Sequence, residues 1–253
     1  MKSVIFTNDD SVNILLPCHD FSSFFETRDN HEVLFRRINT FLIKENLIKK
    51  NIIDLGAWIG DNSIPWAKNI HGIVYAIDPS PDNCEFINKV CELNEITNVK
   101  TIQKAINNIN DILTTDGDIT HCSFVYGNPG LNGKTKVNAV SLDYLYENKT
   151  IENIGYIHLD VEGMEYKVIE GSSKLIEDCR PIISFEQHLE IDDYNIILLY
   201  LKNKNYTVFL IDEILPGCRT DCRNSIAFPN EIYNETLIEN INSFIGKNIL
   251  ISK

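Results

Sequence analysis

The chain has 253 residues, 43% of them apolar, and carries a formal net charge of −13 at pH 7. This composition suits one α/β domain with a full core and excludes wholesale disorder. The strong negative charge argues against a nucleic-acid partner, and no apolar run reaches the ~20 residues needed to span a membrane.

The cysteines and the first residues indicate a reducing compartment. Seven cysteines, an odd number, are scattered through apolar segments, as in proteins that do not rely on disulfides. Asp9 and Asp10 interrupt the apolar residues at the start, so no signal peptide is expected. We therefore expect a soluble, cytoplasmic protein, and the sequence does not indicate its oligomeric state.

Residues 1–48 predict an N-terminal flap followed by a helix. Two apolar segments, residues 4–6 and 12–16, suggest a small hairpin. Apolar side chains recur at helical spacing over residues 32–48. A flap lying over the carboxyl edge of the sheet would be a natural lid for a substrate.

Residues 51–63 predict a buried strand, a glycine turn and the start of a helix, which is the first unit of a doubly wound α/β sheet. Asp54 ends the apolar run, and Gly56 and Gly60 follow without the third glycine of a dinucleotide fingerprint. An acid at this place repels a pyrophosphate and suits a ligand with an ammonium or sulfonium group. S-adenosylmethionine carries both groups.

The next two predicted strands continue the nucleoside site. Residues 72–77 read as a buried strand that ends at Asp78, and residues 82–94 as a helix. An acid at this strand end is placed to accept hydrogen bonds from a ribose diol. Residues 99–106 read as a third strand, whose far end would border an adenine ring.

The remaining sequence predicts one continuous core, residues 49–230, closed by a C-terminal helix within residues 231–253, so that residues 1–253 form a single domain. Asp160 lies near the end of the fourth strand, and Glu186 and His188 follow the fifth strand. The other expected elements are an inserted hairpin and loop in residues 107–136, a helix capped by Ser141, strands at 154–161, 180–185, 206–211 and 225–228, and helices at 163–171, 194–201 and 231–244.

Four neighbouring strand ends therefore carry acids: Asp54, Asp78, Asp160 and Glu186. Burying each of these acids costs desolvation energy unless a hydrogen-bond donor or a cation pairs with it. A soluble domain has no ordinary need for four of them at one sheet edge, so we expect a ligand site there.

Six stretches resemble the FkbM-type methyltransferases. They are Ile53-Asp-Leu-Gly-Ala-Trp-Ile-Gly60, Val74-Tyr-Ala-Ile-Asp-Pro-Ser-Pro81, Ser141-Leu-Asp-Tyr-Leu145, Ile157-His-Leu-Asp-Val-Glu-Gly-Met-Glu165, Val168-Ile-Glu-Gly171 and Arg180-Pro-Ile-Ile-Ser-Phe-Glu186. The resemblance covers about residues 50–190 and departs from the family at His158, where lysine is usual, and at Asp78, where glutamate is usual. It implies a class I methyltransferase fold, Rossmann-like, with a doubly wound, mostly parallel seven-stranded sheet.

The resemblance also implies S-adenosylmethionine as cofactor and methyl transfer, most often to a hydroxyl. The base candidates that face the acceptor are Asp160, Glu186 and His188. Glu162 and Glu165 serve either the site or the turn at Gly163. The implied cofactor residues are Asp54, Gly56, Ala57, Trp58, Gly60, Asn62, Ser63, Asp78, Pro79, Ala105 and Ile106.

No residue is assigned as a metal ligand. Asp160 and Glu186 stand where some related O-methyltransferases hold a divalent ion, so metal dependence is left open. Cys218 and Cys222 are four residues apart without partners at ligand spacing, and packing near a turn explains them better than a metal site.

Several functions remain open from the sequence. The leading hypothesis is O-methylation of a sugar or glycan, and a small natural product or a lipid hydroxyl is an alternative acceptor. A nicotinamide-dependent oxidoreductase and a non-catalytic Rossmann-like binding module are the alternatives from other classes. We expect a small-molecule or glycan acceptor, no nucleic acid and no membrane span.

Overall fold

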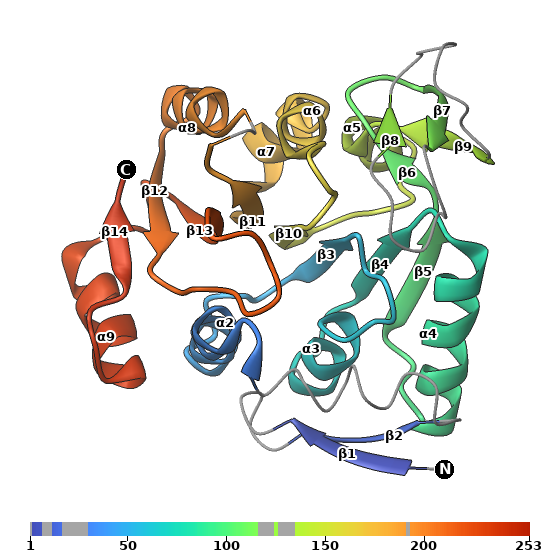
Figure 1. The fold of residues 1–253 in the computed structure, drawn as a ribbon, viewed down its shortest axis with the longest axis horizontal. Helices are drawn as coiled ribbons and strands as arrows, with labels where there is room; N and C mark the ends of the chain where they lie inside the picture. The colour runs from blue at the N-terminus through green and yellow to red at the C-terminus, as the bar shows by residue number, and fades with distance from the viewer. Residues whose placement is uncertain (1, 7–11, 17–29, 116–123, 126–134, 191–192) are drawn as a thin grey trace.

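The computed structural model describes residues 2–6, 12–16, 30–115, 124–125, 135–190 and 193–253. Its main element is an eight-stranded sheet, seen nearly edge-on in Figure 1. In spatial order the strands are β14 (Leu250–Ser252), β12 (Tyr206–Ile211), β13 (Cys222–Pro229), β11 (Ile182–His188), β10 (Ile154–Leu159), β3 (Asn51–Leu55), β4 (Val74–Asp78) and β5 (Val99–Gln103).

The sheet is mostly parallel and doubly wound, as expected. Strands β11, β10, β3, β4 and β5 pair in parallel, and β13 pairs antiparallel with both β11 and β12. The predicted count of seven strands is wrong by one, because β14 adds an eighth strand against β12. This strand follows Gly246, whose φ of +88° ends the last helix. Three residues are too few for a periodic pattern, so the sequence predicted only a helix there.

Helices cover both faces of the sheet (Figure 1). One face carries α2 (Val33–Lys44), α3 (Ser63–Asn69), α4 (Pro81–Leu93) and α9 (Glu235–Ile245), and the other carries α5 (Leu142–Glu147), α6 (Glu165–Glu170), α7 (Ser173–Cys179) and α8 (Tyr194–Asn203). Ser141 caps α5 as predicted, since its side chain accepts a hydrogen bond from the Tyr144 N–H. None of the helices in the described part of the chain is long and apolar enough to cross a membrane.

The expected third strand, residues 99–106, is divided in the structure. β5 ends at Gln103, and β6 (Ala105–Ile106) joins a second sheet in the order β6, β9 (Thr135–Val140), β7 (Asp111–Thr115) and β8 (Phe124–Val125). The Lys104 N–H bonds to the Ile102 carbonyl and turns the chain between the two sheets. The predicted inserted hairpin is present in β7 and β8, and residues 116–123 and 126–134 lie outside the described residues.

The N-terminal hairpin forms as predicted from β1 (Lys2–Phe6) and β2 (Val12–Leu16). Its position differs from the expected lid. Ile14 and Leu16 pack in an apolar cluster with side chains of α3 and α4, and the Asn94 side chain pairs with both backbone groups of Leu15. Figure 1 shows the hairpin outside these helices. The described part of the flap therefore covers helices and not the carboxyl edge of the sheet.

Candidate functional site at the carboxyl edge of the sheet

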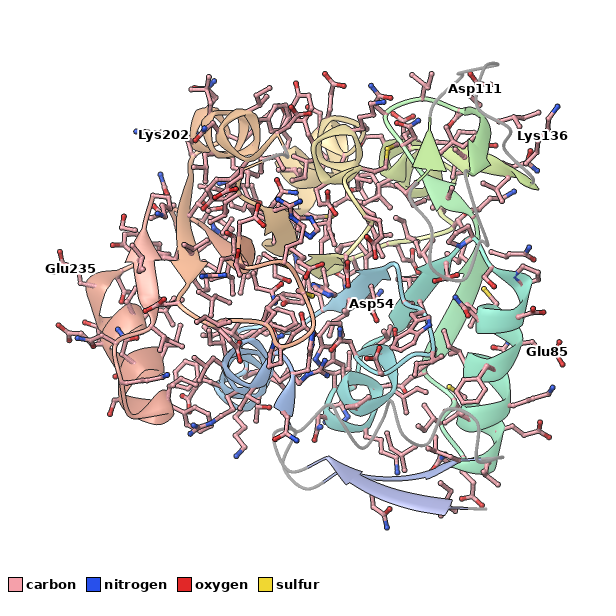
Figure 2. All side chains as sticks on the ribbon, in the orientation of Figure 1. Asp54, Glu85, Asp111, Lys136, Lys202 and Glu235 are labelled. Atoms are coloured by element: carbon pink, nitrogen blue, oxygen red, sulfur yellow. The ribbon has the colours of Figure 1, made fainter. Side chains whose placement is uncertain are left out.

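The glycine turn after β3 is built around one buried acid. Asp54 is 1% exposed and accepts a hydrogen bond from the Ser63 hydroxyl at the start of α3. Gly56 and Gly60 have φ of +73° and +77°, a region that favours glycine. Figure 2 shows Asp54 near the middle of the molecule, whereas Glu85, Lys202 and Glu235 lie at its periphery. The acid is therefore held inside the fold beside the turn.

The turn is packed directly against the strand end that carries Asp160. A Cβ on Gly56 would lie 1.8 Å from the Asp160 carbonyl oxygen, and the Asp160 N–H donates to the Leu55 carbonyl. The N–H groups of Gly56 and Ala57 both donate to the Ile77 carbonyl of β4. The predicted cofactor turn and the predicted acceptor site are thus adjacent.

Asp78 at the end of β4 is held by three hydrogen bonds. Its Oδ2 accepts from the Trp58 N–H at 2.9 Å, and its Oδ1 accepts from the Ser80 N–H at 2.8 Å and the Asn83 side chain at 3.0 Å. Asp78 is 4% exposed, and Trp58 has a φ of +45°. The acid therefore connects the glycine turn to α4 through Pro79 and Ser80, a structural role beside the predicted one toward ribose.

Ala105 and Ile106 are placed in the core. Each is 6% exposed, and they pair with Ala139 and Val140 of β9. Their side chains leave little surface for a ring to contact. Their assignment to an adenine pocket stays a prediction.

The structure brings Asp160 and Glu186 together. Leu159 and Phe185 are paired in the β10–β11 register, so the acids that follow them stand side by side, Asp160 just beyond β10 and Glu186 still within β11. The two carboxyl groups share a hydrogen bond. Burial and then the Glu186 charge raise the pKa of Asp160 well above its usual range, and burial also raises the pKa of Glu186. The pair is suited to holding one proton between two carboxyl groups.

His188 lies two residues beyond Glu186, on the same face of β11 and opposite Cys222 in the register. His158 is placed differently, because it is 2% exposed and its ring lies 4.9 Å from Phe35 and 5.7 Å from Trp66 between ring centroids. Its Nδ1 is 3.0 Å from the Ser184 hydroxyl. The histidine that replaces the usual lysine is therefore part of the core.

Glu165 anchors the turn at Gly163. Its Oε1 accepts from the N–H groups of Val161 and Gly163, and its Oε2 accepts from the Gln187 side chain at 3.1 Å. Glu165 is 3% exposed. The sequence left open whether Glu165 serves the acceptor site or the turn at Gly163. Its hydrogen bonds in the structure are those of a residue that holds the turn.

Sequence analysis missed a polar group at the start of α2. Glu32 precedes the helix with a φ of +53°, and its carboxylate accepts from Arg36 at 2.9 Å and from Asn224 at 2.8 Å. Arg36 is 2% exposed and also donates to the Asn62 side chain at 3.0 Å. The only local signal was the Glu32–Arg36 spacing of four residues, which is typical of a surface pair. This arginine connects α2 to the predicted cofactor turn.

Cys218 and Cys222 also lie at this edge, which their spacing did not indicate. Cys222 Sγ is 2.6 Å from Glu186 Oε1, and Cys218 Sγ is 3.8 Å from the same oxygen and 3.9 Å from His31 Nε2. Hydrogen bonds from Cys222 and His31 lower the pKa of the Cys218 thiol to about 4. Hydrogen bonds to Cys218 and Glu32 raise the pKa of His31 to about 10. The loop between β12 and β13 is therefore joined to the segment before α2.

One solved structure with a TM-score above 0.5 agrees with this fold, and two further methyltransferases are less similar. The methyltransferase FkbM of Methylobacillus flagellatus superposes with a TM-score of 0.51 at 14% identity over 70% of this chain, which spans 43% of that protein. A precorrin-6y C5,15-methyltransferase of Geobacter metallireducens gives 0.46 at 11% identity, covering 76% of this chain and 87% of its own. An rRNA methylase of Streptococcus thermophilus gives 0.48 at 11% identity, covering 76% and 95%.

At 14% identity the likeness to the Methylobacillus flagellatus protein describes the fold and not the substrate. No curated protein sequence matches the chain significantly. The model of the methyltransferase FkbM domain family, however, matches residues 54–208, which is more than half of the sequence. That match begins at the acid before the glycine turn and includes both strand ends of the Asp160–Glu186 pair. The chain belongs to the FkbM methyltransferase domain family.

Proposed function

We propose that this chain is an S-adenosylmethionine-dependent methyltransferase that methylates a hydroxyl group, with a sugar or glycan as the first acceptor to test. The observation that carries the proposal is the contact between Gly56 of the turn and the backbone of Asp160. It puts the family's cofactor motif next to a pair of hydrogen-bonded carboxyl groups, one of which has a strongly raised pKa. A methyl donor and a base would therefore meet at one point of the sheet edge.

The residues of the turn fit this cofactor. S-adenosylmethionine, when bound, supplies an electrophilic methyl group on a positively charged sulfur. Asp54 and Asp78 offer negative charge to the ammonium group and hydrogen-bond acceptors to the ribose, and Gly56 and Gly60 keep the backbone free of side chains. The Trp58 N–H already donates a hydrogen bond to Asp78. A ribose hydroxyl would therefore either bond to the same carboxylate beside Trp58 or replace the Trp58 hydrogen bond.

The Asp160–Glu186 pair would manage the proton of the acceptor. An alcohol is a poor nucleophile until a base accepts its proton, and a base works best when its pKa lies near the working pH. The raised pKa of Asp160 moves a carboxyl group in that direction. Glu186 stays hydrogen-bonded to Asp160 and would hold it in place. His188, farther along β11, is the alternative base.

The charge of the site supports a neutral, hydroxyl-rich acceptor. Glu32 and Glu186 both raise the pKa of Asp160 through their negative charge, so an anionic acceptor would meet repulsion. Sugar hydroxyls donate to carboxylates and carry no charge of their own. A natural-product or lipid hydroxyl offers the same group on a more apolar body.

The proposal is tested in two steps. S-adenosylmethionine should raise the melting temperature of the protein, because a ligand that binds only the native state stabilises it, while NAD should leave it unchanged. Mass spectrometry of candidate glycans incubated with protein and methyl-labelled cofactor should then show a labelled product. A shift with NAD alone would point to an oxidoreductase. Binding without product on sugars, lipids and natural-product alcohols would favour a non-catalytic module.

A further inference from the structure

Three potential metal ligands converge beside the Asp160–Glu186 pair. Glu186 Oε1, Cys218 Sγ and Cys222 Sγ all lie within 4.8 Å of one another. They come from separate places in the chain, namely the end of β11, the loop after β12 and the first residue of β13. Both thiols are free. The fold therefore assembles a set of ligands that the sequence spacing alone did not reveal.

His31 provides a fourth ligand from a further segment. Its Nε2 is 3.9 Å from Cys218 Sγ, and the residue stands just before α2. Zinc at ~2.3 Å from sulfur and ~2.0 Å from nitrogen or oxygen in a tetrahedron separates its ligand atoms by about 3.3–3.8 Å. The distances from Cys218 Sγ to His31 and to Glu186 Oε1, 3.9 and 3.8 Å, are close to these edges.

Two distances have to change on binding. His31 lies outside the set of atoms within 4.8 Å of one another, so its ring has to move toward Glu186 and Cys222 to complete a tetrahedron. Cys222 Sγ and Glu186 Oε1 are 2.6 Å apart, about 1 Å closer than two ligands of one zinc ion. Glu186 is partly exposed, so a small rotation of its carboxylate lengthens its distance to Cys222. Cys222 is fully buried and Cys218 is exposed, which leaves an open side for an ion to enter.

We propose that His31, Glu186, Cys218 and Cys222 form a tetrahedral binding site for a transition metal, with Zn²⁺ as the preferred ion. Two thiolates, one imidazole and one carboxylate are a borderline-soft donor set that selects zinc over magnesium or calcium. The positive ion would also offset the negative charge that Glu32, Asp160 and Glu186 bring to this edge.

The site would fasten two covering segments to the sheet. His31 belongs to the segment leading into α2, and Cys218 to the loop between β12 and β13. Both would be tied to the β11–β13 pair, where Glu186 and Cys222 stand. Glu186 would then serve as a ligand, and Asp160 would remain the carboxyl group available to an acceptor.

The first experiment uses the unmodified chain. Metal-free protein is titrated with Zn²⁺ and analysed by inductively coupled plasma mass spectrometry after gel filtration, and we expect one zinc per chain. Replacing Zn²⁺ with Co²⁺ should give thiolate-to-cobalt charge-transfer absorption in the near ultraviolet and the intense visible bands of tetrahedral cobalt. Weak octahedral bands without the charge-transfer absorption would overturn the proposal, and so would a zinc content near zero.

Variants then locate the ion. Cys218→Ser with Cys222→Ser should abolish stoichiometric zinc, and His31→Ala should weaken zinc binding roughly tenfold or more, since even outer partners of a ligand act on that scale. Cys179→Ser is the matched control, because this free cysteine lies in α7 away from the cluster. Circular dichroism of each metal-free variant shows whether it is folded.

Two results would contradict the assignment even if zinc is bound. Zinc retained in a folded Cys218→Ser/Cys222→Ser protein would place the ion elsewhere. A disulfide mapped to Cys218 and Cys222 by peptide mass spectrometry of the freshly purified chain, with no zinc bound after reduction, would show that the two cysteines form a redox pair instead.

Discussion

The Cβ position of Gly56 lies 1.8 Å from the carbonyl oxygen of Asp160, which joins the glycine turn after β3 to the acid after β10. Only a residue without a side chain allows this approach, and the φ of +73° at Gly56 favours glycine as well. The turn thus needs its first glycine for packing within the protein, apart from any ligand. A substitution there should be costly even without cofactor.

Gly56→Ala should destabilise the metal-free, cofactor-free protein by about 2–4 kcal/mol. The methyl group forces the turn away from a backbone oxygen that cannot rotate aside. We expect the melting temperature to fall by more than ~5 °C in a chain of this length. Differential scanning calorimetry measures the change.

Gly246→Ala is the control for backbone conformation alone. Gly246 has a φ of +88° and no atom within 4 Å of its Cβ position, so it should cost only about 1–2 kcal/mol. Equal losses in the two variants would mean that the contact with Asp160 relaxes without cost.

Asp78→Asn should weaken S-adenosylmethionine binding by about 1–3 kcal/mol, the usual loss when hydrogen bonds to a charged acceptor are removed. Isothermal titration calorimetry gives the affinity. Ser80→Ala is the matched control, because the Ser80 hydroxyl caps α4 by accepting from the Asn83 N–H. If both variants lose the same affinity, Asp78 acts by holding α4. If Asp78→Asn binds normally, the ribose lies elsewhere.

The strands and the glycine turn could be predicted because their signals are local. Ile52 and Ile53 form a short apolar run, and Gly56 marks the turn after it. Ser141 caps α5 by bonding to Tyr144, three residues along the chain. Each signal depends on neighbours in the chain and on the carboxyl ends of parallel strands meeting at one edge. The pairing of Asp160 with Glu186 follows from that rule alone.

The other half of the site could not be predicted because its contacts are distant in sequence. Arg36 has the helical spacing of a surface residue, yet it is buried against Asn62, 26 positions away. Cys218 meets His31 across 187 positions. The residues next to Arg36 and Cys218 in the sequence carry no pattern that indicates these distant partners. The break at Lys104 was missed for a similar reason, since β6 finds its partner in β9.

Asp160→Asn should lower turnover by about 10²–10⁴, the range expected when a general base is lost. Asparagine keeps the shape and can still hydrogen-bond to Glu186, so cofactor affinity should not change. Single-turnover assays with a confirmed acceptor measure the effect. His188→Ala is assayed beside it. A large loss in His188→Ala with near-normal turnover in Asp160→Asn would transfer the role of base to the histidine.

Glu213 should make stability fall as pH rises. Its carboxylate accepts from the N–H groups of Leu34 and Phe35 at the start of α2, yet burial dominates and raises its pKa. A raised native pKa means that ionisation is costlier in the folded state, so this cost appears as pH increases through the native pKa. Glu213→Gln, which cannot ionise, should therefore gain melting temperature relative to the parent between pH 4 and pH 8.

Glu85→Gln provides a control of opposite sign. Lys89 lowers the pKa of the exposed Glu85. The ion pair therefore stabilises the folded protein above the unfolded-state pKa of Glu85, and this stabilisation is lost as pH falls. The melting temperature of Glu85→Gln should therefore fall slightly relative to that of the parent as pH rises from 4 to 8. A Glu213→Gln difference that is constant with pH would mean that Glu213 titrates as it does in the unfolded chain.

Arg36→Met should destabilise the protein by about 3–5 kcal/mol, because it takes the nearer cation from the buried Glu32 carboxylate and leaves His31, at 3.7 Å. Arg36 is 2% exposed and bonds to Glu32 at 2.9 Å, to Asn62 at 3.0 Å and to the His31 carbonyl at 3.2 Å. Urea unfolding followed by circular dichroism gives the free energy. The double variant Arg36→Met/Glu32→Gln should recover much of the loss, since the buried carboxylate charge is gone and His31 still has Cys218 as a partner. Lys89→Met, which breaks the exposed pair with Glu85, should leave the midpoint unchanged. If the double variant is no more stable than Arg36→Met alone, the arginine acts through Asn62 and the cofactor turn and not through the charge of Glu32.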